Sequence, residues 1–128
     1  MSKRPPAAAL TFDDVEELAR DLPRVERGTA YGSPALKIDG KLLACVPTHR
    51  SAEPQSLAVR IDFADRDELI ANEPGIFYLK EHYVDYACVL VRLNRIHRDA
   101  LRDLLHMAHR FISAGRPRVH RARRAARR

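Results

Sequence analysis

The dipeptide Asp39-Gly40 constrains the fold of this chain more than any other local feature, because it separates two apolar runs, residues 35–38 and 42–46. Asp-Gly between apolar runs is the strongest short-range signal for a β-hairpin, since the tight turn needs backbone angles that glycine adopts readily. Lys37 and Lys41 lie one on each arm. The segment is therefore predicted to form a small basic ribbon that projects from the folded body.

A rigid bend is predicted directly before this hairpin. Gly28 and Gly32 permit backbone angles that other residues resist, and Pro34 fixes its own φ angle. This stretch is expected to turn the chain into the hairpin, and no strand is assigned to it.

Apolar periodicity and capping signals predict the remaining elements. Thr11 is a suitable N-cap for a first helix that Pro23 ends, and Gly115 and Pro117 end the last one. Helices are expected at residues 12–22, 65–72 and 98–113, and further strands at residues 56–61, 76–80 and 87–93. Together with the hairpin, the predicted order is α-β-β-β-α-β-β-α, an α+β arrangement in one domain.

The net charge of +6 is unevenly distributed. The first 113 residues hold sixteen Lys and Arg against seventeen Asp and Glu, so the excess lies in the seven arginines that follow. Residues 11–22 and 62–73 are acidic, whereas residues 24–61 hold six bases and three acids. The hairpin region is therefore predicted to be the positive end of a slightly acidic body.

The chain divides into a lead, a domain and a tail. We expect residues 1–10 to be disordered, residues 11–113 to fold, and residues 114–128 to form a disordered basic tail, because arginine and alanine cannot build a core. Such arms bind polyanions without reading sequence. The tail residues expected to contact phosphates are Arg116, Arg118, Arg121, Arg123, Arg124, Arg127 and Arg128.

Localisation is predicted from what the chain does not contain. No apolar run has the length of a membrane span, and the apolar patch near the start is too short for a signal peptide. Cys45 and Cys88 both lie in apolar runs and are expected to be buried free thiols. A reduced, cytoplasmic protein without membrane contact is expected, and its oligomeric state stays open.

Several short motifs, in order, resemble one family. They are Leu22-Pro23, Tyr31-Gly32 with Pro34-Ala35, residues 40–44, residues 57–62, Lys80 with His82-Tyr83, and residues 89–93. Over residues 12–112 the chain resembles the MmcQ/YjbR family. The resemblance implies an antiparallel sheet covered by helices, similar to the secretion-chaperone architecture. It also implies a double-wing DNA-binding surface built from hairpins.

Four cations are candidates for such a surface. Lys37, Lys41, Arg50 and Arg60 lie on or beside the hairpin and a second projecting turn, residues 47–55. A two-stranded ribbon fits the major groove of DNA, and an arginine on a loop can enter the minor groove. The alternative is that these cations only keep edge strands from aggregating.

A second candidate site combines Lys80, His82 and Tyr83, with Tyr86 nearby and Tyr31 across the sheet. Histidine and tyrosine can stack on bases or donate to phosphates. The alternatives are a structural cluster and acid–base chemistry. A deep pocket that converges on His82 would favour an enzyme, and a filled surface would not.

Other chemistry is expected to be absent. The sequence contains no nucleophile elbow, no phosphate-cradling glycine loop and no paired catalytic carboxylates. Asp103, His106 and His109 drift around the last helix and are interpreted as a solvated face, so no metal and no cofactor are expected. The sequence therefore predicts a non-enzymatic DNA-binding protein; the alternatives are a protein-interaction module of chaperone-like fold and a small-molecule enzyme that uses His82.

Overall fold

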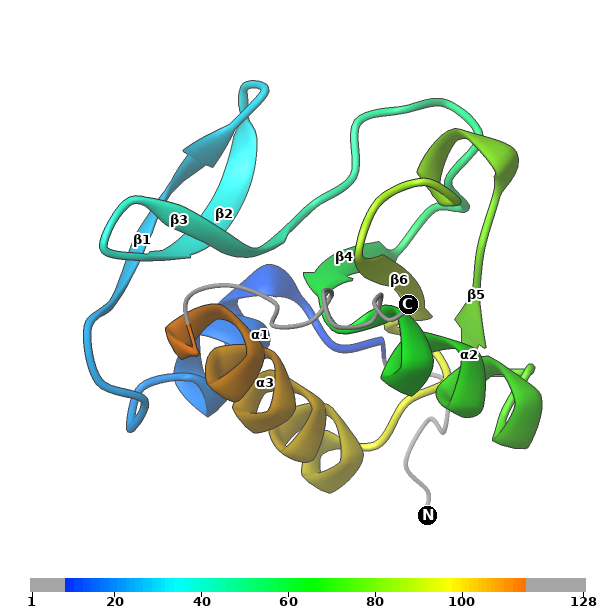
Figure 1. Cartoon of the computed structure of the whole chain (residues 1–128). Coiled ribbons are helices and arrows are strands. Elements are labelled where there is room, and N and C mark those ends of the chain that lie inside the picture. Colours follow the sequence, from blue (N-terminus) through cyan, green and yellow to red (C-terminus); the bar gives the residue numbers. More distant parts are fainter. Residues whose placement is uncertain (1–8, 115–128) are drawn as a thin grey trace, which may run out of the picture.

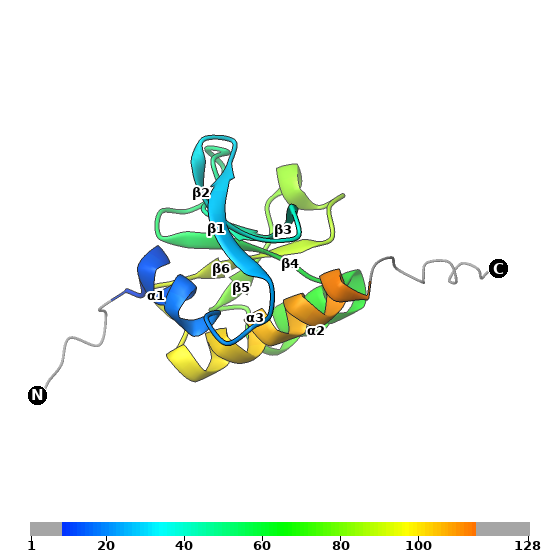
Figure 2. The same cartoon turned by 90° about the vertical axis from the view of Figure 1, so that its left-hand side faces the viewer.

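The computed structural model describes residues 9–114, which form a six-stranded sheet with the α-helices on one side (Figures 1 and 2). The helices are α1 (Phe12–Leu18), α2 (Phe63–Asn72), the 3₁₀ turn η1 (Glu81–Tyr83) and α3 (Arg98–Ser113). The strands are β1 (Val25–Ala30), β2 (Ser33–Ile38), β3 (Lys41–Cys45), β4 (Ser56–Arg60), β5 (Phe77–Tyr78) and β6 (Cys88–Arg92).

The strands lie in the order β1-β2-β3-β4-β6-β5, and every neighbouring pair is antiparallel. Helices α1 and α3 pack together and cover the same side of the sheet (Figure 2). The predicted α+β class, an antiparallel sheet covered by helices in one domain, is confirmed.

The predicted hairpin is confirmed as β2 and β3. Its turn residues, Asp39 and Gly40, have φ angles of 50° and 84°, as the type I′ hairpin turn requires. Ile38 pairs with Lys41 and Lys37 with Leu42, and a register shift follows between Leu36 and Lys37.

The segment interpreted as a bend is instead an edge strand, and this expectation was wrong. Strand β1 pairs with β2 along its whole length, from Val25 opposite Ile38 to Ala30 opposite Ser33. Its sequence, VERGTA, has charged residues and an internal glycine, which are unfavourable in isolated strands but common on protected edges. Pairing with β2 therefore overrides the local preference, and the order of elements gains one strand.

Several boundaries also differ from the prediction, and two of the differences change how the chain packs. Helix α1 ends at Leu18 rather than near Leu22, because the chain leaves the helix through turns before Pro23; Leu22 is nevertheless buried. Leu10, expected in the lead, donates its N–H to the Leu93 carbonyl at 3.1 Å and packs on the core. Of the tail predicted at residues 114–128, residues 115–128 lie outside the described residues, as do residues 1–8 of the lead.

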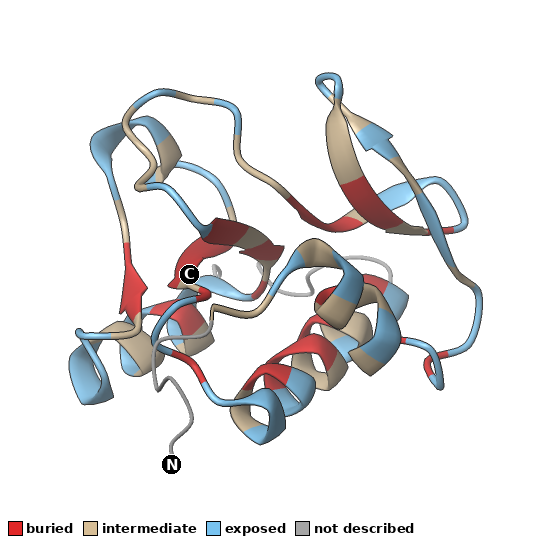
Figure 3. Cartoon of the chain, turned by 180° about the vertical axis from the view of Figure 1, so that it is seen from behind, coloured by how far each residue is buried: buried red, intermediate tan, exposed pale blue. Residues whose placement is uncertain are grey.

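The core lies between the sheet and the helices (Figure 3). Strand residues Ala44, Val59 and Val89, which are opposite one another in β3, β4 and β6, meet Leu101 and Leu105 of α3 there. The apolar stripe predicted for α3 is thus confirmed, and among the described residues no α-helix covers the opposite face of the same strands.

Candidate functional site

The open face of the sheet is defined by its register. Cys45 lies opposite Ala58, and Arg60 lies opposite Cys88. Each of these four residues is next in sequence to a core residue of its own strand. Because side chains alternate between the faces of a sheet, these four point away from α1 and α3. They form the floor of the site.

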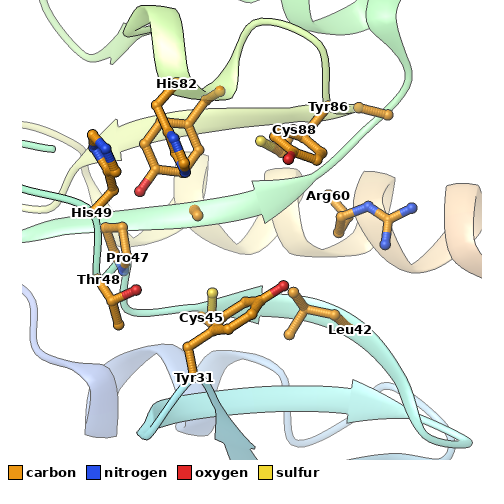
Figure 4. A pocket seen from close by; sticks show the side chains of 13 residues that line it. Tyr31, Leu42, Cys45, Pro47, Thr48, His49, Arg60, His82, Tyr86 and Cys88 are labelled. Atoms are coloured by element: carbon orange, nitrogen blue, oxygen red, sulfur yellow. The ribbon is translucent and has the colours of Figure 1, made fainter. Parts of the chain in front are cut away.

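A pocket of about 710 Å³ lies above this floor, between two walls (Figure 4). One wall is the tip of the β1–β2 hairpin with Tyr31. The other is the segment around η1, with His82, Tyr83 and Tyr86, joined by His49 from the 46–55 loop. The pocket brings together Arg60, His82 and Tyr83, three of the predicted site residues, from separate parts of the chain.

Tyr31 is held by a strained turn. Tyr31 and Gly32 have φ angles of 55° and 80°, so this turn has the same left-handed φ pattern as Asp39-Gly40. Glycine, asparagine and aspartate suit such angles, whereas a bulky residue there is an outlier and costs about 1 kcal/mol or more. The ring is also 86% exposed, so packing on the core does not offset that cost.

Tyr86 is positioned by a buried arginine. The Arg66 guanidinium of α2 is buried and donates to the carbonyl oxygens of Val84 at 3.0 Å and of Tyr86 at 3.3 Å. It also binds Asp67 at 3.0 Å and lies over the Phe63 ring. Arg66 is the donor to the Val84 carbonyl, whereas the Tyr86 carbonyl also accepts from the Cys88 N–H at 2.8 Å. Arg66 therefore fixes the path of the segment that carries Tyr86 mainly through Val84.

His49 and His82 join the loop to the second wall. Their rings stack at a centroid distance of 3.7 Å and an interplanar angle of 11°, and Tyr83 lies edge-on to His82 at 4.8 Å. The Ser51 N–H donates to Nδ1 of His49 at 3.1 Å, so this nitrogen is unprotonated. Desolvation, with smaller contributions from the charges of His82 and Arg50, lowers the pKa of His49 below 6.5.

The two thiols are buried at the pocket floor, as predicted. Burial raises the pKa of Cys45 above its usual value and that of Cys88 to about 11. A thiol must lose its proton to act as a nucleophile, so these side chains serve as small apolar surface at neutral pH.

The rest of the open face is occupied by a structural network. The Arg92 guanidinium donates to both carboxylate oxygens of Glu53, at 2.8 and 2.9 Å, and lies over the Tyr78 ring. The Tyr78 hydroxyl hydrogen-bonds with Ser56 and accepts from the Glu53 N–H. Lys80, a predicted site residue, lies over the same ring at 5.8 Å, outside the pocket lining.

The structure separates the two hairpin lysines. Lys37 lies opposite Leu42, a pocket residue, and therefore faces the open side. Lys41 lies opposite Ile38, a core residue, and therefore points to the other side, where its side chain is exposed at the periphery. Arg50 is exposed next to His49, and the seven tail arginines lie outside the described residues.

The predicted cations differ in their partners from the arginines beside the first helix. Near the helices, Arg27, Arg98 and Arg102 bind the acids of the first helix region, Asp13, Asp14, Glu16, Glu17 and Asp21, at 2.8 to 3.4 Å. Within residues 9–114, no carboxylate oxygen lies within 4.0 Å of Lys37, Lys41, Arg50, Arg60 or Lys80. The predicted cations are therefore free to meet an anion.

Sequence reasoning missed three contributors. His49 was part of the projecting turn, but nothing local connects it with His82, 33 residues later. Arg66 was interpreted as one base in an acidic helix, and only its burial reveals its role. Leu42 was an ordinary strand residue. Burial and pairing, which bring these residues to the site, have no signature in local composition.

Residues 9–114 contain neither a candidate metal cluster nor a candidate membrane-spanning helix. Residues 9–114 contain no group of three or more His, Cys, Asp or Glu side chains placed to hold a metal. In the same part of the chain, no helix combines the length and apolar character that a bilayer crossing needs.

Comparison with known sequences identifies relatives over most of the chain. Residues 20–111 match the family described as YjbR. Uncharacterised proteins of Mycobacterium bovis and Mycobacterium tuberculosis are each 34% identical over 110 residues, which cover 74% of this chain and 82% of the relative.

Comparison with solved structures supports the fold. The crystal structure of the Deinococcus radiodurans protein DR2400, assigned to the domain family DUF419, superposes with a TM-score of 0.66 at 18% sequence identity. The match covers 88% of this chain and 84% of that one. At this identity the likeness extends to the architecture.

Proposed function

Because the chain belongs to the YjbR family and presents unpaired cations beside exposed aromatic rings, we propose that it is a non-enzymatic, cytoplasmic DNA-binding protein. The open face supplies Lys37, Arg50 and Arg60, and the tail supplies sequence-independent affinity. Phosphate contacts dominate the affinity of proteins for nucleic acid, and cations already bound to carboxylates contribute little to them.

The observation that carries the proposal is that Lys37, Arg50 and Arg60 on the open face have no carboxylate oxygen within 4.0 Å. Arg92 of the same face differs, because it binds Glu53. Near the helices, Arg27, Arg98 and Arg102 bind acids of the first helix region. The acids of α2, of which only Asp67 is ion-paired, lie on the helix side. A polyanion would therefore approach the open face and avoid α2.

A salt series tests this proposal. Fluorescence polarisation measures DNA affinity of the full chain and of a chain ending at Ser113. If all seven tail arginines meet phosphates, the tail alone contributes roughly −6 to the log–log salt slope. Retained affinity of the shorter chain would assign binding to the domain, and no binding of either chain at low salt would refute the proposal.

Lys37 and Lys41 provide a matched pair for the same titration. Both are lysines of one hairpin, but only Lys37 faces the open side. Lys37→Ala should reduce the salt slope by about one, and Lys41→Ala should leave it unchanged. Equal effects of the two substitutions would show that the hairpin, rather than the open face, contacts DNA.

A second candidate function is the binding of a small planar anion. The volume of about 710 Å³ lies within the range of ligand pockets, and His82 lines the pocket, as a small-molecule enzyme that uses His82 would require. The raised pKa values of Cys45 and Cys88 argue against thiol catalysis. Thermal stabilisation by a mononucleotide, without affinity for oligonucleotides, would favour this candidate over DNA binding.

A stoichiometric protein partner recovered in a nuclease-insensitive pull-down would favour the interaction module instead.

A further inference from the structure

We propose that the pocket accepts one unstacked base of single-stranded DNA, so that the protein prefers single strands to duplexes. The inference rests on the proposed DNA-binding function and names the form of DNA that the site selects. It is carried by the two exposed tyrosines, by the character of the floor between them and by the unpaired arginine beside it.

Tyr31 supplies one aromatic wall of the pocket. Its left-handed φ of 55° is a conformation that bulky residues avoid, and the ring is 86% exposed. The equivalent position of the other hairpin turn carries Asp39, which suits this backbone. A strained residue whose side chain gains nothing from the core points to a role outside the fold. The turn holds this ring at the pocket mouth (Figure 4).

Tyr86 supplies the opposite wall of the pocket. Tyr86 is 58% exposed, and Arg66 holds its backbone through the carbonyls of Val84 and Tyr86. The stacked rings of His82 and His49 continue this wall. Tyr31 and Tyr86 thus lie on opposite sides of one cavity (Figure 4). Aromatic side chains in such positions stack on bases of any sequence, because every base has a flat π-face.

The floor of the pocket combines small uncharged side chains with one arginine. Ala58, Ala87, Cys45 and Cys88 are small and uncharged at neutral pH, so they leave room for a flat apolar group. Arg60 also lines the pocket, without a carboxylate within 4.0 Å. A flat apolar floor with a cation beside it matches a base with its attached phosphate.

A DNA duplex and an extended peptide both suit this pocket less well than a single strand. A duplex keeps its bases stacked and must flip one out to fill the pocket, which costs unstacking and unpairing energy that a single strand does not pay. An extended peptide would add to an edge strand, and the edges of this sheet are β1 and β5 rather than the floor strands β3, β4 and β6.

The test uses the full chain and a labelled mixed-sequence oligonucleotide of about 15 nucleotides, single-stranded or annealed to its complement, in fluorescence polarisation titrations. Tyr31→Asn removes the ring and places a residue that this turn prefers, so the variant folds at least as well as the parent. Tyr31→Phe keeps the ring and is the matched control. Tyr86→Ala tests the other wall.

The expected result is a parent protein that binds the single strand more tightly than the duplex. Tyr31→Asn and Tyr86→Ala should each weaken single-strand binding by about 5- to 150-fold and leave duplex binding within about two-fold, since loss of one stacking contact acts only on the unpaired base. Tyr31→Phe should retain single-strand affinity.

Two outcomes overturn the inference, and they are distinguishable. A parent that binds the duplex at least as tightly, with Tyr31→Asn unchanged on single strands, refutes the pocket assignment and leaves DNA binding intact. A parent that binds neither form at low salt refutes the proposed function itself, and the pocket assignment with it.

Discussion

The two walls of the pocket present a tyrosine in different ways. Tyr31 is held by the backbone of a hairpin turn with two left-handed residues, and its side chain touches little. Tyr86 is held from behind by the buried Arg66, through two carbonyl oxygens. One wall thus depends on local conformational energy, and the other on a charged hydrogen bond that reaches across 20 residues of sequence.

The two walls therefore depend on different interactions, and different substitutions would disturb each of them. A change in turn chemistry affects the first wall and leaves the second intact, whereas a change in charge or protonation affects the second. The β2–β3 turn provides an internal reference, because Asp39-Gly40 has the same left-handed φ pattern with a favourable residue in the first position.

The largest effect is expected from Arg66→Met, which keeps the apolar length and removes the donors. The substitution leaves the Val84 carbonyl without its donor, while the Tyr86 carbonyl keeps the Cys88 N–H. A buried acceptor without a partner costs about 1–3 kcal/mol, so the free energy of unfolding should fall by that amount. Urea denaturation measures it. Arg20→Met, at an exposed arginine without an ion pair in the described chain, should change stability by no more than about 0.5 kcal/mol. Equal losses for the two variants would contradict the positioning role of Arg66.

A smaller and equal effect is expected from Gly32→Ala and Gly40→Ala. Each glycine has a φ near 80°, where an L-residue costs about 1–2 kcal/mol, and an added Cβ would meet no atom within 4 Å. The free energy of unfolding should fall by that amount in both variants. A loss confined to one glycine would show that the two turns are not equivalent.

Tyr31→Asn should raise stability by up to about 1 kcal/mol, because it relieves the strain of a bulky residue at positive φ. The converse change, Asp39→Tyr, should lower it by a similar amount and also remove the 2.9 Å contact to Arg24. Thermal unfolding of both variants measures the difference. A stability loss in Tyr31→Asn would mean that the ring supports the fold, against the structure described above.

The smallest effect concerns pH and the second wall only. The folded-state pKa of His49 lies below 6.5, so the unfolded chain binds more protons and stability falls as pH drops through 6.5. Residues 25–45 contain no histidine, so the Tyr31 wall should not respond. NMR titration of the His49 ring should give a midpoint below 6.5, and His82→Phe should raise it by removing one repulsive charge. A midpoint above 6.5 would reverse the sign of this prediction.

Sequence patterns predicted the elements that are set locally. The Asp39-Gly40 hairpin, the strand that follows residue 55 and the amphipathic helix α3 were all visible, because each has a periodicity or turn chemistry within a short window. Strand β1 was not visible, because its polar residues and glycine form a strand only when β2 is available to pair with.

By itself, the sequence determined the α+β class, the basic character of the hairpin and the burial of both thiols, since composition and spacing encode these. The tertiary structure alone decided that Lys37 and Lys41 face opposite ways, that His49 stacks on His82, and that Arg66 supports Tyr86. The physical reason is that register and long-range pairing assign each side chain to a face. A shift of one residue would exchange those faces without any change in local composition.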